Sequence, residues 1–361
     1  MVKNARRLGR RDFLKGLGLG AGALALGGGK ALAGVGASAG LEPRFAGETI
    51  FPHLPPSQLY KKVKAPSVVS LVKGESRYDV VLKSLQLIED EVVGAIGRKK
   101  ILLKPNIVLS QSELSCTHVD ATRAVLDFLA PHVKRQIVIG ESGVQNTMEG
   151  FKNYGYLELE KNYNVKIVDL NLTPTEDRYV LGLGNKPGRI RIIREFLDPE
   201  TYLISVSRMK THNYVFVTLS LKNVLMAAPL NEYGKVNDKG FMHMAAPARN
   251  DLLHFNMFHL AQEVYPDLAV IDGFVGMEGR GPAWGTPISS KVALASRDAL
   301  ACDITGTRVM GYDPARINYL AAMAEAGLGQ GDIAKIRLVG TPFDECFMPY
   351  KPNPEMAELY R

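Results

Sequence analysis

From residue 67 onward, short apolar runs alternate with segments of helical periodicity, and this alternation leaves few fold classes open. The runs are continuously apolar, which is typical of strands that are buried on both faces. They lie at residues 101–103, 136–139, 165–168, 201–206, 268–271, 291–295 and 336–339. Such strands, separated by helices, predict an α/β fold with a mostly parallel sheet and helices on both faces. The length also leaves room for two lobes.

Four stretches between these runs have the pattern of helices. Residues 78–96 carry apolar side chains at helical spacing, and Gly97 is a plausible stop. Residues 119–129 form a second candidate, which Pro131 would end. Residues 298–310 and 315–326 complete the set. The sequence shows neither an internal repeat nor a coiled coil.

The first 33 residues have the features of an export signal. Arg10 and Arg11 begin a twin-arginine pattern, and a glycine-rich apolar stretch follows at residues 16–26. That stretch is too short to span a bilayer about 30 Å thick. Small residues at 31–33 offer a cleavage site, and residues 37–39 offer a second one. We therefore expect export of the folded chain by the twin-arginine translocon to the periplasm. The alternatives are a disordered basic start or an uncleaved membrane anchor.

The basic balance of the whole chain comes mostly from this signal. The formal charge is +7, but beyond residue 33 only 37 of the 44 Lys and Arg residues remain, against 36 of the 37 Asp and Glu residues. Nucleic-acid binding needs a basic stripe in the folded body, and such an excess is absent from the mature sequence. No other stretch approaches 18 continuous apolar residues, so we expect no stable membrane span.

The flanking segments and the cysteines add little chemistry. Residues 34–66 are rich in Gly, Pro and Ala and are interpreted as a linker or extended arm, residues 67–340 as the α/β domain, and residues 341–361 as a C-terminal tail. Cys116, Cys302 and Cys346 form no C-x-x-C pair, so we expect neither a structural zinc site nor an iron–sulfur cluster in this chain. One disulfide is compatible with export, but the sequence does not select a pair.

Polar side chains follow five of the predicted strands. They are Lys104 and Asn106, Glu141 and Ser142, residues 207–212, Asp272, and residues 296–298. In parallel α/β sheets, ligands bind where the carboxyl ends of the strands converge. These residues therefore predict a site, although Asp298 could equally cap the following helix.

The segment at residues 208–223 is the strongest candidate for chemistry. It contains Arg208, Lys210, His212, Lys222 and Asn223, separated by apolar and hydroxyl residues. A histidine can shuttle protons near neutral pH, and a desolvated lysine can act as a nucleophile or hold a covalent cofactor. The competing interpretation is a surface loop with solvated lysines. The apolar residues on both sides of Lys222 favour the functional interpretation.

Two further stretches are weaker candidates. His243 is a candidate metal ligand, whereas His254 and His259 are five residues apart, align poorly on a helix face and are interpreted as structural. Residues 272–285 form a glycine-rich segment with Glu278, whose backbone could approach a phosphate or carboxylate. The body contains neither the dinucleotide-binding nor the P-loop pattern.

Together these motifs resemble the family known as domain of unknown function 362. The residues that carry the resemblance are Lys104-Pro-Asn, Gly140-Glu-Ser-Gly, Lys210-Thr-His with Lys222-Asn, Asp272-Gly with Glu278, and Ser296-Arg-Asp with Asp303. They span residues 101–340. Some relatives carry a ferredoxin-like domain with iron–sulfur cysteines, and from its cysteine pattern we expect no such domain in this chain.

A more distant similarity links the chain to the nickel-pincer lactate racemases. Asp120-Ala-Thr-Arg123 resembles their Asp-x-Thr-Arg motif, and His212 precedes Lys222 by ten residues, like their catalytic His and cofactor-holding Lys. The resemblance implies a metal or a covalently held cofactor on Lys222. The chain departs from the racemases between these two residues, where they are glycine-rich, and has Asp238 in place of their later nickel-ligand histidine.

The sequence thus predicts an exported enzyme that acts on a small anionic metabolite, by isomerase or oxidoreductase-type chemistry. Lys104, Arg123, Arg208 and Lys210 would bind the anion, His212 would be the general acid/base, and Lys222 the covalent or electrostatic anchor. Lys210 is also a catalytic candidate. The other ligand-binding candidates are Asn106, Glu141, Ser142, Asn223, Asp272, Glu278 and Asp298. The alternative is a non-catalytic periplasmic ligand-binding or redox-accessory protein.

Overall fold

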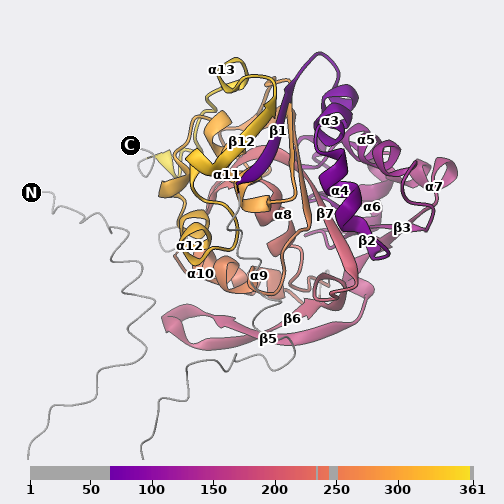
Figure 1. Cartoon of the computed structure of the whole chain (residues 1–361). Helices are drawn as coiled ribbons and strands as arrows, with labels where there is room; N and C mark the ends of the chain where they lie inside the picture. The colour runs from indigo at the N-terminus through magenta and orange to yellow at the C-terminus, as the bar shows by residue number, and fades with distance from the viewer. Residues whose placement is uncertain (1–65, 233–234, 244–250, 358–361) are drawn as a thin grey trace, which may run out of the picture. The chain divides into compact units, whose positions relative to one another are not determined.

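The apolar runs assemble into one large mixed sheet in which parallel pairs predominate (Figure 1). Eight strands follow the order β12-β1-β11-β9-β7-β2-β3-β4, with β8 (Phe216–Thr218) paired to β7 and β10 (Thr286–Ile288) paired to β9. The eight are β1 (Ser67–Lys73), β2 (Lys100–Pro105), β3 (Ile137–Glu141), β4 (Val165–Asp169), β7 (Thr201–His212), β9 (Leu268–Glu278), β11 (Val292–Ser296) and β12 (Ile336–Gly340). The predicted α/β class is confirmed.

This computed structural model describes residues 66–232, 235–243 and 251–357. The twin-arginine pattern, both cleavage sites and the linker up to residue 65 lie outside the described residues. All described residues belong to a single compact unit, so a division into two lobes is not found among them. None of their helices is long and apolar enough to cross a membrane.

One strand direction differs from the expectation that all five strand ends converge. β9, β7, β2, β3 and β4 run parallel to one another, whereas β11 is antiparallel to β9, with Ser296 opposite Ala269. The segment after β11, which contains Asp298, therefore lies beside the amino ends of the parallel strands. The other four predicted segments lie at the carboxyl ends of those strands.

Two strands are longer than predicted. β7 and β9 were expected to end at Val206 and Ile271, but they continue to His212 and Glu278. Every residue of β7 is buried, including the charged ones. Polar residues can lie inside these strands because side chains and backbone groups of other segments form hydrogen bonds with them. The periodicity of the sequence does not reveal such partners.

Helices cover both faces of the sheet (Figure 1). On one face, α3 (Arg77–Gln86), α4 (Glu89–Ile96) and α5 (Val119–Leu129) bury their apolar sides in one core cluster. On the other face, α8 (Ser220–Leu225), α10 (Asp251–Leu260), α11 (Ala299–Val309) and α12 (Asn318–Ala326) share the second cluster. Short helices complete the set: α6 (Thr147–Asn153), α7 (Leu159–Asn162), α9 (Asp238–Met242) and α13 (Phe343–Cys346).

The predicted single helix at residues 78–96 is two helices. Ser76 caps α3, and the chain leaves helical geometry at Ile88 before α4 begins. Gly97 ends α4 with a φ of 49°, a conformation that favours glycine. The apolar residues of both helices are buried on the same side, so the periodicity correctly predicted their burial but not the break.

Two segments were not assigned a structure from the sequence. β5 (Thr175–Leu181) and β6 (Pro187–Ile193) form a separate antiparallel hairpin. Residues 341–357, which belong to the expected tail, pack on the body: Tyr350 is buried, and its hydroxyl lies 2.8 Å from Ser290 Oγ.

Candidate functional site

A cavity of about 130 Å³ lies at the carboxyl ends of β2, β3 and β7, and residues of α8 and α9 also line it. Nine of the fourteen predicted site residues line it: Lys104, Asn106, Glu141, Ser142, Lys210, His212, Lys222, Asn223 and His243. The remaining lining residues were not predicted: Ile107, Val108, Gly143, Val144, Thr218, Met226, Ala227, Lys239 and Pro282. The convergence of parallel strand ends therefore brings together most of the predicted site.

The cavity is unusually rich in lysine. Lys104, Lys210, Lys222 and Lys239 come from four different elements, and each is at most 7% exposed. Lysine is almost never fully buried unless it is paired. Among the described residues, Glu141 is the only carboxylate that lines the cavity, so the lysines outnumber the acids there by four to one.

Of the four cavity lysines, Lys104 is the only one that pairs with a carboxylate of the described residues. Its Nζ donates to Glu141 Oε2 at 2.8 Å, to Asn223 Oδ1 at 2.6 Å and to the Pro105 carbonyl at 2.8 Å. All three ammonium donors are therefore used. Burial lowers the pKa of Lys104, and the charge of Glu141 opposes that change.

Glu141 also fixes the backbone at the cavity wall. Its Oε2 accepts from the amide of Ile107 at 2.6 Å, and its Oε1 accepts from the amide of Ser142 at 2.7 Å. Glu141 is 2% exposed. One carboxylate thus ties the end of β2, the end of β3 and the ammonium of Lys104 together.

Within the described part of the chain, Lys210 is held by neutral oxygens alone. Its Nζ donates to Asn106 Oδ1 at 2.8 Å and to the carbonyl of Ser115. Burial lowers its pKa to about 7, with the positive charges of Arg208 and Lys104 acting in the same direction. Lys210 therefore gains or loses its proton near neutral pH.

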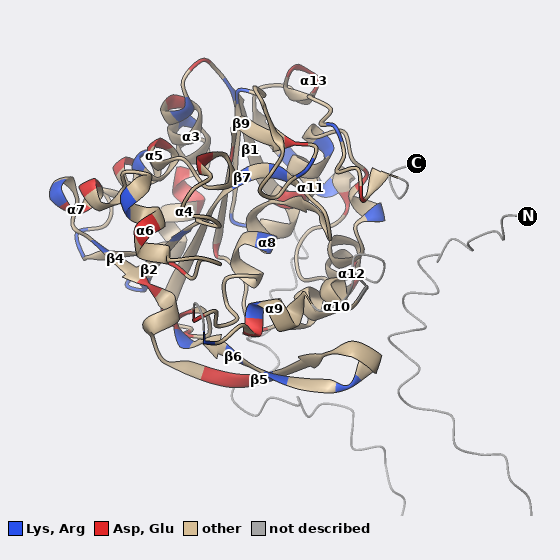
Figure 2. Ribbon diagram, turned by 180° about the vertical axis from the view of Figure 1, so that it is seen from behind, with Lys and Arg blue, Asp and Glu red and all other residues tan. Residues whose placement is uncertain are grey.

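Lys239, which the sequence analysis missed, enters the cavity from α9. Its Nζ donates to the carbonyl of Ser142 and to Ser142 Oγ at 3.3 Å, and burial lowers its pKa to about 8. The neighbouring Asp238 accepts from Arg191 Nε at 2.9 Å, which anchors α9 to β6. α9 thus carries adjacent basic and acidic residues with separate tasks (Figure 2). Lys239 and His243 are four residues apart, which places them on the same face of a helix. This spacing is the sequence signal from which Lys239 could have been predicted.

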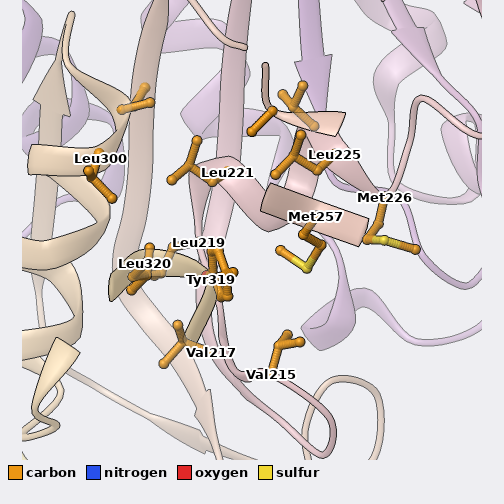
Figure 3. Packing of buried hydrophobic residues seen from close by; sticks show 14 of the residues in the cluster. Val215, Val217, Leu219, Leu221, Leu225, Met226, Met257, Leu300, Tyr319 and Leu320 are labelled. Carbon is orange, nitrogen blue, oxygen red and sulfur yellow. The ribbon is translucent and has the colours of Figure 1, made fainter. Parts of the chain in front are cut away.

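Lys222 lies on α8, whose apolar residues hold the helix in the core. Leu221 and Leu225 lie among Met257, Leu300 and Leu320 (Figure 3). Asp303 of α11 accepts from the amides of Ser220 and Leu221 at 2.9 and 3.0 Å, which satisfies the first turn of α8.

No hydrogen-bond or ion-pair partner of Lys222 occurs among the described residues. Its pKa is well below the ordinary lysine value, first because of burial and then because Lys210, Lys239 and Lys104 are positive. An unpaired buried ammonium is costly, so the neutral amine is the favoured form of this side chain.

Two histidine rings stack at the cavity, with centroids 6.5 Å apart. His212 Nδ1 accepts from the amide of Tyr214 at 3.0 Å, so in the neutral ring Nε2 carries the proton. His243 Nδ1 lies 2.8 Å from the Lys239 carbonyl and must donate to it, which leaves a lone pair on Nε2. Burial lowers the pKa of His212 well below its usual range and the pKa of His243 to about 3. The pair thus combines one donor and one acceptor nitrogen.

Five predicted residues lie outside the cavity lining. Arg123 is on α5, where it pairs with Asp120, so the motif shared with the racemases is not at this site. Arg208 donates to the carbonyls of Cys116 and Val275. Asp298 lies at the opposite sheet edge, where it caps α11 and accepts from Ser67 Oγ at 2.6 Å.

The other two outlying residues have structural partners. Asp272 pairs with Arg77 at 3.1 Å, and Glu278 accepts from the amide of Lys351 at 2.9 Å. Buried carboxylates need such partners, which the sequence pattern does not reveal. His254 also has a structural contact: it accepts from the amide of Tyr319 at 3.1 Å, as its interpretation predicted.

The described residues contain no cluster of three or more His, Cys, Asp or Glu side chains arranged to hold a metal ion. His212 and His243 could supply two nitrogen ligands, so any metal here would need ligands from elsewhere. The three cysteines are buried and free.

The model of the family described as domain of unknown function (DUF362) matches residues 101–308. The chain belongs to this family. The match includes the strand ends and the α8 lysine that build the cavity, but ends before α12.

One relative and two solved structures resemble this chain at sequence identities of 27% or less. A thylakoid-associated protein of Synechocystis sp. is 27% identical over 269 residues, which covers 72% of this chain and 79% of the relative. The lactate racemase apoprotein from Thermoanaerobacterium thermosaccharolyticum aligns with a TM-score of 0.42 at 13% identity, covering 69% of this chain and 58% of the racemase. A Thermotoga maritima protein aligns with a TM-score of 0.39 at 10% identity, covering 71% of this chain and 59% of its own.

Proposed function

We propose that this DUF362 protein is an exported enzyme that binds a small anionic metabolite in the lysine-lined cavity. The single observation behind the proposal is the charge imbalance: after Lys104 and Glu141 neutralise each other, Lys210 and Lys239 face the cavity beside the neutral Lys222, without a further carboxylate among the described residues. Burying cations in this way costs stability unless an anion offsets it. Binding a carboxylate or phosphate would supply that compensation.

The size and polarity of the cavity narrow the ligand class. Its volume of about 130 Å³ is below the roughly 300–1,000 Å³ of pockets for drug-sized ligands. Thr218 also lines the cavity, and its buried hydroxyl has no hydrogen-bond partner among the described residues. These features favour a small organic acid that carries a hydroxyl or carbonyl group.

His212 is the proposed general acid/base. Its lowered pKa keeps the ring neutral at pH 7, so His212 Nε2 carries a proton that it can donate to a substrate oxygen, while the lone pair on His243 Nε2 can accept a proton from a bound substrate. The protonated lysines would stabilise the negative charge that develops on the substrate. Lys222 is proposed to anchor the ligand.

Calorimetric titration with lactate, malate, pyruvate and inorganic phosphate tests the binding step. At least one should bind, and Lys210→Met and Lys239→Met should each weaken binding by tenfold or more, about 1.4 kcal/mol. Lys166→Met, on an exposed part of β4, is the matched control and should bind like the wild type. Failure of all four anions to bind would overturn the proposed ligand class.

NMR of the same acids after incubation tests the enzymatic step. His212→Gln should retain binding and lose any conversion that the wild type performs. Tight binding without conversion of any of the acids would instead favour the non-catalytic binding protein.

Export by the twin-arginine route is part of the same proposal. It is supported by the Arg10-Arg11 pattern and the short apolar stretch that follows. Replacing both arginines by lysine should leave an uncleaved precursor in the cytoplasm, as measured by cell fractionation. Unchanged export of that variant would contradict this route.

A further inference from the structure

We infer that Lys222 forms an imine with the carbonyl carbon of a small 2-oxo carboxylic acid bound in the cavity. The inference rests on the proposed anion-binding function and adds a substrate class and a covalent step. It begins from a difference between Lys222 and the other three lysines.

The other three lysines are held by acceptors in the native state. Lys104 has three acceptors, Lys210 has two, and Lys239 contacts both oxygens of Ser142. Lys104, whose three ammonium protons are all donated, has no lone pair to offer, and the two acceptors of Lys210 and of Lys239 hold each of those nitrogens in place. Lys222 alone among the four has no partner in the described part of the chain, and it lines the cavity.

The surroundings of Lys222 favour a nucleophilic amine. Burial and the three neighbouring lysines all disfavour its protonated form. A lysine desolvated beside other cationic groups is a recognised way to obtain a reactive amine at neutral pH. The free amine has the lone pair that attack on a carbonyl carbon requires.

The position of Lys222 is fixed before a ligand enters. α8 is buried along its whole length, its first turn is satisfied by Asp303, and Leu221 and Leu225 pack in the core. Because the backbone is held, little ordering is needed to bring Nζ to a bound carbonyl.

The rest of the cavity supplies the groups that a 2-oxo acid needs. Lys210 and Lys239 carry donors for the carboxylate, and Thr218, whose hydroxyl has no partner among the described residues, also lines the cavity. His212 and His243 offer one donor and one acceptor nitrogen for proton transfers. An isolated carboxylic acid without a carbonyl would leave the unpaired amine unused.

The step balances without an oxidant or reductant. The Lys222 nitrogen adds to the carbonyl carbon, and its proton passes to the carbonyl oxygen to give a carbinolamine. Loss of the second nitrogen proton and of the hydroxyl group as water then forms the carbon–nitrogen double bond. The histidines carry these protons between nitrogen and oxygen.

Borohydride trapping of the full-length protein with pyruvate tests the inference. Reduction of the imine gives a stable secondary amine, which intact mass and peptide mapping locate. We expect one pyruvyl adduct, on Lys222. Lys222→Met should lose the adduct and unfold at a urea concentration equal to or higher than the wild type, because a buried unpaired amine is removed. Lys166→Met should keep full labelling.

Separate results bear on the inference and on the proposed function. If pyruvate binds by calorimetry but no adduct forms on Lys222, the imine is refuted and anion binding stands. Equal labelling of the wild type and Lys222→Met would also refute it, because the adducts would then be on other lysines. If other anions bind and pyruvate does not, the 2-oxo acid class is wrong.

Discussion

Removing the charge of Glu141 should destabilise the protein strongly, because it leaves the Lys104 ammonium buried without its counter-ion. Lys104 and Glu141 are 1% and 2% exposed, and their charged atoms are 2.8 Å apart. Breaking one side of such a buried pair typically costs about 3–5 kcal/mol. In Glu141→Gln, the amide oxygen can still accept from only one of the two backbone amides of Ile107 and Ser142, so the upper half of that range is expected.

Urea unfolding followed by circular dichroism measures this loss. If the free energy of unfolding falls by about 3 kcal/mol per molar urea, the midpoint of the unfolding transition should fall by about 1–2 M. Glu158→Gln is the matched control, because Glu158 pairs with Lys161 at the surface, where an ion pair contributes about 0–1 kcal/mol. Its midpoint should stay close to that of the wild type.

A double-mutant cycle with Lys104→Met then isolates the pair. The double variant should be no less stable than Glu141→Gln alone, because the uncompensated charge has gone. If Glu141→Gln loses no more stability than Glu158→Gln, or if the coupling energy is below about 0.5 kcal/mol, the reasoning about this buried pair is wrong.

Four further predictions follow from the same geometry. Burial lowers the pKa of Lys210 to about 7 and that of Lys239 to about 8, so anion binding at pH 8 should be accompanied by proton uptake. Calorimetry in buffers of different ionisation enthalpy measures this uptake, and a value of zero would contradict the prediction. Anion affinity should fall as pH rises from about 7 to 9, since the lysines lose their charge. Asp238→Asn should loosen α9 from Arg191 and weaken anion binding by about two- to fivefold, equivalent to about 0.5–1 kcal/mol; unchanged affinity would count against it. Burial raises the pKa of Asp303 to about 8, so the folded protein favours its neutral form, and the stability that this group contributes is lost as the pH rises from about 4 to 8. The free energy of unfolding of Asp303→Asn should therefore depend less on pH over that range.

Much of the site could be read from the sequence because it lies at strand ends. Lys104, Glu141 and Lys210 follow or continue buried apolar runs, and parallel strands end at the same edge. Lys239 was not predicted because it lies on α9, a helix of only five residues that is not part of the strand pattern. Asp298 was misplaced because an apolar run does not encode the direction of its strand.

The sequence by itself determined the fold class, the family motifs and most of the cavity residues, since periodicity records which faces are buried. Only the tertiary structure decided which charges are paired. Lys104 meets Glu141 across 37 residues and Asn223 across 119 residues, and no local pattern reports contacts at that separation. The same applies to Lys222: its lack of a partner depends on where all the other acceptors lie once the chain has folded.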